Sequence, residues 1–256
     1  MNSPKIILLF LCISFIGTLY AQKNISLEDK IPIDSSVSIG KLDNGLTYYL
    51  RYNKKPEKRV FLRLVLNAGS ILEEENQKGL AHFVEHMAFN GTKNFAKNEI
   101  INYLESIGMR FGADVNASTS FDETVYMIEV PTDSLEMVVK GIQILKEWAS
   151  NVSFDSVEIE KERGVIIEEW RLGRGAEARI FDKQAPVLLK NSKYAERLPI
   201  GETEIIETFD HETLKKFYKD WYRPDLMAVI AVGDIDKEWL EEKIKLFFSL
   251  NRTTRD

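Results

Sequence analysis

Residues 79–92 read GLAHFVEHMAFNGT, and the interpretation of the whole chain starts from this segment. Two of the three histidines, His82 and His86, stand here four positions apart. Residues with this spacing are neighbours on one face of an α-helix, about 5–6 Å apart at their Cβ atoms. Two imidazoles placed in this way can bind one metal ion, with zinc–nitrogen distances of about 2.0–2.1 Å. Glu85 stands beside them and can reach a water on that ion without being a ligand itself.

The helix expected over residues 79–89 is hydrophobic on several sides. Its large hydrophobic residues are Phe83, Val84, Met87 and Phe89. This distribution is typical of a buried helix and not of a solvated one. The alternative is a pair of surface histidines on an amphipathic helix, which a five-residue motif alone does not exclude. Buried histidine and glutamate side chains need polar partners, and a cation would supply one.

A catalytic zinc ion usually has three protein ligands and one open position, so a third ligand is expected elsewhere. The acidic segment 160–169, EKERGVIIEE, offers several carboxylates. One helical stripe of this segment contains Glu162, Val165, Ile166 and Glu169. The stripe is hydrophobic in its middle and is expected to face inward. This favours Glu169 as the ligand and Glu162 as a carboxylate that supports a ligand from behind. The remaining glutamates fit a solvated acidic face.

Local patterns predict strands interspersed with helices along the chain. Strands are expected at 46–52, 60–66, 110–118, 124–130 and 227–232, and helices at 79–89, 98–107, 135–150, 155–171, 210–221 and 236–248. Asn98, the segment 132–134 (Thr-Asp-Ser) and Asp155 are expected to cap their helices. The segments 110–118 and 124–130 flank a turn, which indicates an antiparallel hairpin. The predicted fold class is α+β, a mainly antiparallel sheet with helices packed on it.

The first 21 residues differ from the rest of the chain. Lys5 precedes an almost unbroken apolar run, and the small residue Ala21 comes before the polar Gln22. The pattern predicts a secretory signal peptide over residues 1–21. The alternative is an uncleaved anchor, which would need about 20 apolar residues. We therefore expect residues 22–256 to form one exported domain without a stable membrane anchor.

The composition limits the remaining possibilities. The 256-residue chain is 44% hydrophobic and 29% charged, which is typical of a globular protein. Its one cysteine, Cys12, lies in the leader, so no disulfide is expected after cleavage. A formal net charge of -6 and the lack of a basic patch argue against a nucleic-acid partner. Two glycosylation sequons, which begin at Asn90 and Asn116, lie in segments that are expected to form the active site. A bulky glycan would be hard to accommodate there, which favours export into a bacterial periplasm or medium.

Four segments, in sequence order, resemble the pitrilysin family of inverzincin zinc metallopeptidases, which includes insulin-degrading enzyme and mitochondrial processing peptidase. They are HFVEHMAFNGT (82–92), NASTS (116–120), ERGVIIEEW (162–170) and WYRPDLMAVIAVGDID (221–236). The resemblance covers most of the chain from about residue 42 onward. It implies that this chain is the N-terminal zinc-bearing domain and that a second homologous domain or subunit is missing from it.

The resemblance also assigns the metal site. It implies that His82, His86 and Glu169 bind Zn²⁺ and that Glu162 assists catalysis, in agreement with the helical stripe. The interval from His86 to Glu169 is a few residues longer than the family pattern, so Glu162 stays as an alternative ligand.

The function implied is a zinc-dependent endopeptidase that hydrolyses peptides or unfolded proteins, with Glu85 as general base. Asn116 and Ala117 are expected on an edge strand that pairs with the substrate backbone, although an ordinary hairpin strand is the alternative. A non-catalytic peptide-binding or partner subunit of the same fold is a second possible function. A structural zinc protein is a third, but such sites normally have four closed ligands. His211 is expected at the surface, where a helix begins.

Overall fold

A six-stranded sheet organises the described part of the chain. The computed structural model describes residues 31–249, of which residues 36–249 belong to one unit. The strands are β1 (Val37–Lys41), β2 (Thr47–Tyr52), β3 (Arg59–Leu66), β4 (Val115–Thr119), β5 (Thr124–Pro131) and β6 (Met227–Gly233). Their order is β1-β2-β6-β3-β5-β4, and among these strands only β2 and β6 pair in parallel. The predicted fold class, a mainly antiparallel sheet with helices, is confirmed.

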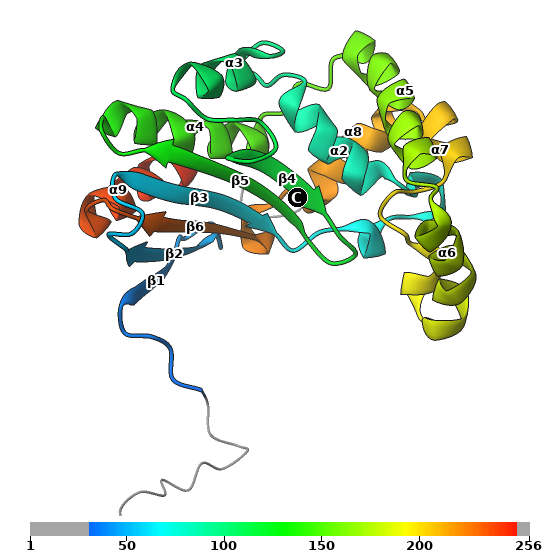
Figure 1. The fold of residues 1–256 in the computed structure, drawn as a ribbon, viewed down its shortest axis with the longest axis horizontal. Helices are drawn as coiled ribbons and strands as arrows, with labels where there is room; N and C mark the ends of the chain where they lie inside the picture. Colours follow the sequence, from blue (N-terminus) through cyan, green and yellow to red (C-terminus); the bar gives the residue numbers. More distant parts are fainter. Residues whose placement is uncertain (1–30, 250–256) are drawn as a thin grey trace, which may run out of the picture. The chain divides into compact units, whose positions relative to one another are not determined.

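The helices form two groups around this sheet (Figure 1). Their bounds are α2 (Leu80–Phe89), α3 (Glu99–Ser106), α4 (Leu135–Ser150), α5 (Ser156–Leu172), α6 (Ala176–Leu188), α7 (Thr203–Thr208), α8 (His211–Trp221) and α9 (Lys237–Phe248). Helix α4 packs on β3 and β5, and α9 packs on β2. Helix α2 contacts β4, α5 and α8, so it lies between the edge strand β4 of the sheet and helices α5 and α8.

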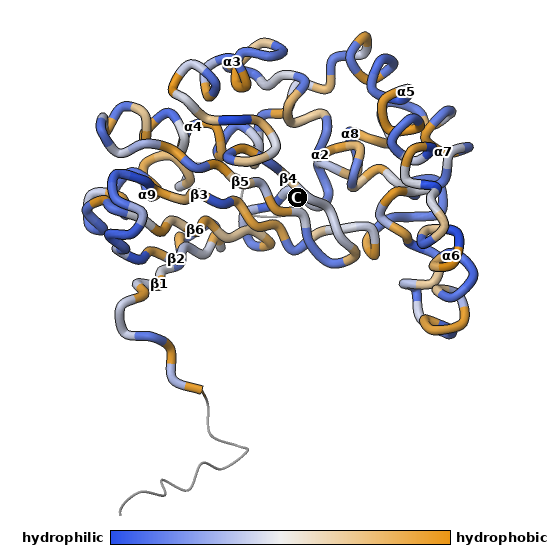
Figure 2. Tube along the Cα trace, in the orientation of Figure 1, coloured by the Kyte–Doolittle hydropathy of each residue, from blue (hydrophilic) through white to orange (hydrophobic). Residues whose placement is uncertain are grey.

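The core lies between the sheet and α4 with α9. Strand β6 is hydrophobic over its whole length (Figure 2), as expected for a strand with neighbours on both sides. Leu62 pairs with Ala231 across β3 and β6, and both side chains are buried. A Cβ atom on Gly141 of α4 would lie 2.8 Å from Leu62 and 3.4 Å from Val130. The glycine therefore lets α4 approach the sheet closely.

Capping residues explain where several helices begin. Ser134 accepts a hydrogen bond from the backbone of Glu136, and Asp155 accepts one from Val157 at 2.9 Å, as predicted. Asn98 stands at the N-cap position of α3, as predicted, but its side chain does not cap the helix. Its backbone is left-handed, with φ of 66°, and its side chain makes no capping hydrogen bond.

One predicted strand needs correction, and three elements were missed. The strand expected over 110–118 begins only at Val115, because Gly112 is in a left-handed conformation and residues 110–114 form a turn held by Arg110 and Asp114. The elements β1, α6 and α7 were not predicted. The signal peptide expected over residues 1–21 lies outside the described residues. Within residues 31–249, no helix is long and apolar enough to cross a membrane.

Candidate metal centre

Helix α2 is fixed at its start by groups from distant parts of the chain. Its N-cap, Gly79, has φ of 98° and no side chain to cap the helix. The buried carboxylate of Glu73 supplies the cap, because its Oε1 accepts the backbone N–H of Ala81 at 2.9 Å. A Cβ on Gly201 would lie 2.4 Å from the Cα of Gly79, so two glycine backbones touch here. These contacts set the position of the helix that carries both histidines.

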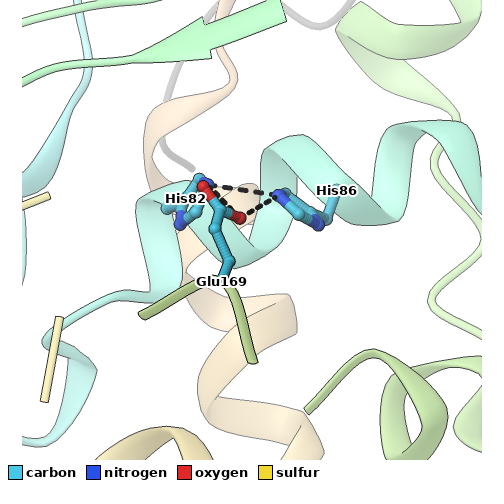
Figure 3. Close-up of side chains that lie close together, drawn as sticks. All are labelled: His82, His86 and Glu169. Atoms are coloured by element: carbon cyan, nitrogen blue, oxygen red, sulfur yellow. Dashed lines mark hydrogen bonds and ion pairs between the residues drawn. The ribbon is translucent and has the colours of Figure 1, made fainter. Parts of the chain in front are cut away.

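His82, His86 and Glu169 converge on one point (Figure 3). The two Nε2 atoms lie 3.1 Å apart, and Oε2 of Glu169 lies 3.7 Å from Nε2 of His82 and 3.5 Å from Nε2 of His86. Donor atoms on a tetrahedral zinc ion with bonds of about 2.0–2.1 Å would be about 3.3 Å apart. The three observed separations are close to that value, so the donor set and its spacing fit a zinc ion with one open position.

Glu162 holds the outer side of His86. Its Oε1 lies 2.7 Å from Nδ1 of His86, and its Oε2 accepts a hydrogen bond from Asn90 at 2.6 Å. Burial acts to raise the pKa of Glu162, but the hydrogen bond and charge of His86, with Asn90, outweigh it and lower the pKa. Glu162 therefore stays ionised and leaves Nε2 of His86 directed at Glu169. This is the geometry of a carboxylate that orients a metal-binding histidine.

The two histidines differ in their electrostatics. Burial, helped by the nearby His86, lowers the pKa of His82 to about 4. Its ring is therefore neutral near pH 7, which is the form that binds a metal. Burial also acts to lower the pKa of His86, but the hydrogen bond and charge of Glu162 raise it overall.

Glu85 lies on the same helix and is 8% exposed. Its Oε2 accepts a hydrogen bond of 2.7 Å from the hydroxyl of Thr119 on β4. Burial raises the pKa of the Glu85 carboxyl, while the hydrogen bond from Thr119 opposes the rise. A carboxylate with a raised pKa is a better proton acceptor near neutral pH, which suits a general base.

The site opens into a cleft of about 810 Å³ between α2, α3, α5 and β4. Its walls include the histidine pair, Glu85, Glu162 and Glu169, and also Asn116 and Ala117 of β4. Val165 also lines the cleft and is 51% exposed. The prediction that its stripe faces inward is thus right for the buried Ile166 but wrong for Val165, because the stripe faces the cleft as well as the core.

Strand β4 is the last strand of the sheet, and β5 is its one strand partner among the described residues. The backbone N–H of Ala117 donates to its neighbour Asn116 at Oδ1, 2.9 Å away, and not to β5. Backbone groups alternate in direction along an antiparallel strand, so Ala117 directs its N–H at the outer edge. The structure therefore places Asn116 and Ala117 beside the candidate metal centre, on an edge strand where the N–H of Ala117 faces away from β5.

Two polar residues of the site were not identified from the sequence, namely Asn90 and Thr119. Both lie in the segments that resembled the family, HFVEHMAFNGT and NASTS, but their partners are distant in sequence. His211 begins α8 at the surface, as predicted, and its Nε2 lies 2.6 Å from Glu160.

Two family models match the chain. The model described as insulinase (peptidase family M16) matches residues 48–176, and the one described as peptidase M16 inactive domain matches residues 208–254. The probable zinc protease PqqL of Haemophilus influenzae is 42% identical over 221 residues, which are 86% of this chain and 24% of that protein. The chain thus spans about a quarter of the length of such curated relatives.

Solved structures agree with this result. The first half of the periplasmic protease PqqL from Escherichia coli superposes with a TM-score of 0.85 at 41% identity, covering 89% of this chain and 48% of that one. The ferredoxin protease FusC in complex with Arabidopsis ferredoxin gives a TM-score of 0.79 at 31% identity, covering 86% of this chain and 25% of that one. By its sequence, fold and family match, the chain belongs to the insulinase family, peptidase family M16.

Proposed function

We propose that this chain is the zinc-bearing part of an endopeptidase that hydrolyses peptides or unfolded proteins. The observation that carries the proposal is the convergence of His82, His86 and Glu169 within 4.8 Å of one another, with Glu85 beside them. The relatives named zinc proteases support Zn²⁺ as the metal. In this proposal His82, His86 and Glu169 bind the metal. Glu85 is the general base, and Glu162 assists.

Each residue has a chemical role in the proposed reaction. A zinc ion here would supply Lewis acidity that lowers the pKa of a coordinated water to about 7. Glu85 would take a proton from the attacking water and later return it to the leaving amine. Glu162 keeps His86 oriented. Asn116 and Ala117 hold the substrate as an added strand along β4, because an unpaired strand edge binds an extended peptide through main-chain hydrogen bonds.

We further propose that activity needs more than this chain. Relatives such as PqqL are about four times as long, and a lone cleft leaves the β4 edge open to water. Poor positioning of a substrate by about 1 Å can cost about 10²-fold in rate. A second homologous domain or subunit would close the cleft and fix the scissile bond. Export to the periplasm, predicted from residues 1–21, is supported by the relative described as a periplasmic protease.

A cleavage assay with metal analysis tests the proposal. The 256-residue chain should bind about one zinc but cleave a quenched peptide slowly, and the polypeptide extended to the length of its relatives should cleave faster. Glu85→Gln should abolish cleavage in both forms and leave the zinc content unchanged, since Glu85 is a base and not a ligand. Undiminished cleavage by Glu85→Gln would overturn the mechanism.

A non-catalytic peptide-binding subunit of the same fold is the alternative, and the assay distinguishes it. Such a subunit would bind zinc or peptide but would show no cleavage that depends on Glu85, even in the extended form.

A further inference from the structure

Thr119 is the residue that connects the proposed base with the proposed substrate edge. We propose that Thr119 is a positioning residue that orients Glu85 and responds to a peptide bound along β4. The inference rests on the proposed function, and it adds a residue to which no role was assigned above.

The Thr119 hydroxyl donates its proton to Glu85. Thr119 Oγ1 lies 2.7 Å from Oε2 of Glu85 and 3.5 Å from Oγ1 of Thr124. Thr124 donates its own proton to the carbonyl of Ala68 at 2.9 Å, so it has none to offer Thr119. An ionised carboxylate only accepts hydrogen bonds, so the Thr119 hydroxyl must be the donor to Glu85.

Thr119 occupies one oxygen of the Glu85 carboxylate and leaves the other available. Among the described residues, Thr119 makes the hydrogen bond that reaches the Glu85 side chain, and it occupies Oε2. Oε1 is then left for proton transfer within the cleft that Glu85 lines together with His82 and His86. Without the hydroxyl, the plane of the carboxylate would be free to rotate about its last bond, and neither oxygen would be held in one direction. The hydrogen bond thus selects one orientation of the base.

The backbone of Thr119 is held firmly. Thr119 is the last residue of β4 and pairs with Thr124 of β5. The turn that follows is closed by the N–H of Ser120, which donates to the carbonyl of Glu123 at 2.8 Å. The carbonyls of Ser120 and Phe121 accept N–H groups from residues 70 and 71 at 3.1 and 2.9 Å. The hydroxyl is therefore presented to Glu85 from a fixed point.

Thr119 also lies on the proposed substrate edge, strand β4. Ala117 directs its N–H away from β5, and residues two apart on a strand point in the same direction. The N–H and carbonyl of Thr119 therefore also face the outer edge of β4. A peptide added to that edge would meet the backbone of Thr119, while the side chain of Thr119 holds the base. Substrate pairing and base orientation thus meet in one residue.

Two substitutions test this role in the complete polypeptide. Thr119→Val keeps the shape of the side chain and removes the hydroxyl, whereas Thr119→Ser keeps the hydroxyl. A hydrogen bond to a charged group contributes about 1.5–3 kcal/mol, which corresponds to about 10–100-fold in rate. Thr119→Val should lower kcat by that factor, with KM changed by less than about twofold and zinc content unchanged. Thr119→Ser should restore most of the lost kcat.

Thr47→Val is the matched control, because it removes a threonine hydroxyl from β2, which lies away from the cleft. It should leave kcat unchanged. Equal loss in Thr119→Val and Thr119→Ser, a change in KM alone, or a loss of zinc would each overturn the positioning role. A parent protein that binds zinc but cleaves nothing would instead overturn the proposed function, and the inference with it.

Discussion

The two helices that supply the candidate ligands, α2 and α5, are held by the fold in very different ways. Helix α2 is short, and seven of its ten residues are buried. Helix α5 has 17 residues, of which Ile159, Glu162 and Ile166 are buried. Both histidines come from the buried helix, while Glu169 comes from the other and its side chain is 51% exposed. Packing thus fixes the helix that carries the two histidines of the candidate site, whereas an exposed carboxylate completes the site.

This difference suggests that the two helices have different roles in metal binding. Buried neighbours and the contact with Glu162 limit the rotation of the two imidazoles, so their spacing is set before a metal binds. Glu169 contacts them from 3.5 and 3.7 Å and has solvent on its other side. It can therefore adjust to the ion. A preorganised pair with one adaptable ligand is suited to a catalytic site, in which the coordination changes during the reaction.

The largest expected contrast is in stability. Phe83 of α2 is fully buried and packs edge-on against Phe209 at 4.8 Å between ring centroids. Phe83→Ala should lower the free energy of unfolding by about 3–5 kcal/mol. Val165→Ala, on the exposed side of α5, should change it by less than about 0.5 kcal/mol. Urea denaturation of both variants measures the difference, and similar losses would show that the two helices are equally well held.

The next contrast is in zinc affinity. Structural zinc sites with four ligands contribute about 10–16 kcal/mol, or roughly 3–4 kcal/mol per ligand. His82→Ala should therefore weaken zinc binding by about 10²–10³-fold, measured by competition with a chelator. Glu169→Gln should weaken it less, because an amide oxygen still reaches the ion from the adaptable side. Glu162→Gln removes a supporting carboxylate and should cost about 10–100-fold.

The order of these losses decides which glutamate is the third ligand. If Glu162→Gln lost more zinc than Glu169→Gln, the ligand would be Glu162, the alternative left open by the sequence. Unchanged zinc in both His82→Ala and Glu169→Gln would rule out the site.

The third contrast is in pH dependence, at the start of α2. Burial raises the pKa of Glu73 to about 8 from its ordinary value of 4.5. The folded state therefore resists ionisation of Glu73, and stability is lost as pH rises from about 4.5 to 8. The loss is at most about 1.4 kcal/mol per pH unit. Glu73→Gln cannot ionise and can still accept the N–H of Ala81, so its stability relative to the parent should rise across this window.

Denaturation of metal-free protein at several pH values measures this effect. Glu75→Gln is the control, because the hydrogen bond from Arg197 lowers the pKa of Glu75, away from this window. A flat difference between Glu73→Gln and the parent from pH 4.5 to 8 would contradict the prediction.

Features that depend on local sequence were predicted well. The caps at Ser134 and Asp155 are short-range hydrogen bonds, and their helices start where expected. The spacing of His82, Glu85 and His86 placed them together on one helix for the same reason. Helix α6 was missed because Ala185 is its one buried residue and Pro186 interrupts the helical pattern. A helix without a buried stripe gives no periodic signal.

Features that depend on distant partners were not predicted. Thr119 reaches Glu85 over 34 positions, and Asn90 reaches Glu162 over 72. No local pattern contains these pairs. The cap on α2 was missed for the same reason, because Glu73 acts on a helix that begins seven positions later.

The place of β6 in the sheet has a consequence for synthesis on the ribosome. β6 is the last of the described strands in sequence, yet it lies between β2 and β3. Until residue 233 has emerged, β2 and β3 each present an unpaired edge, and the nascent chain holds two separate fragments of sheet. Such edges invite association with other chains. Folding of the sheet is therefore completed only near the end of the domain, and a chain that stops before Met227 would lack its central strand.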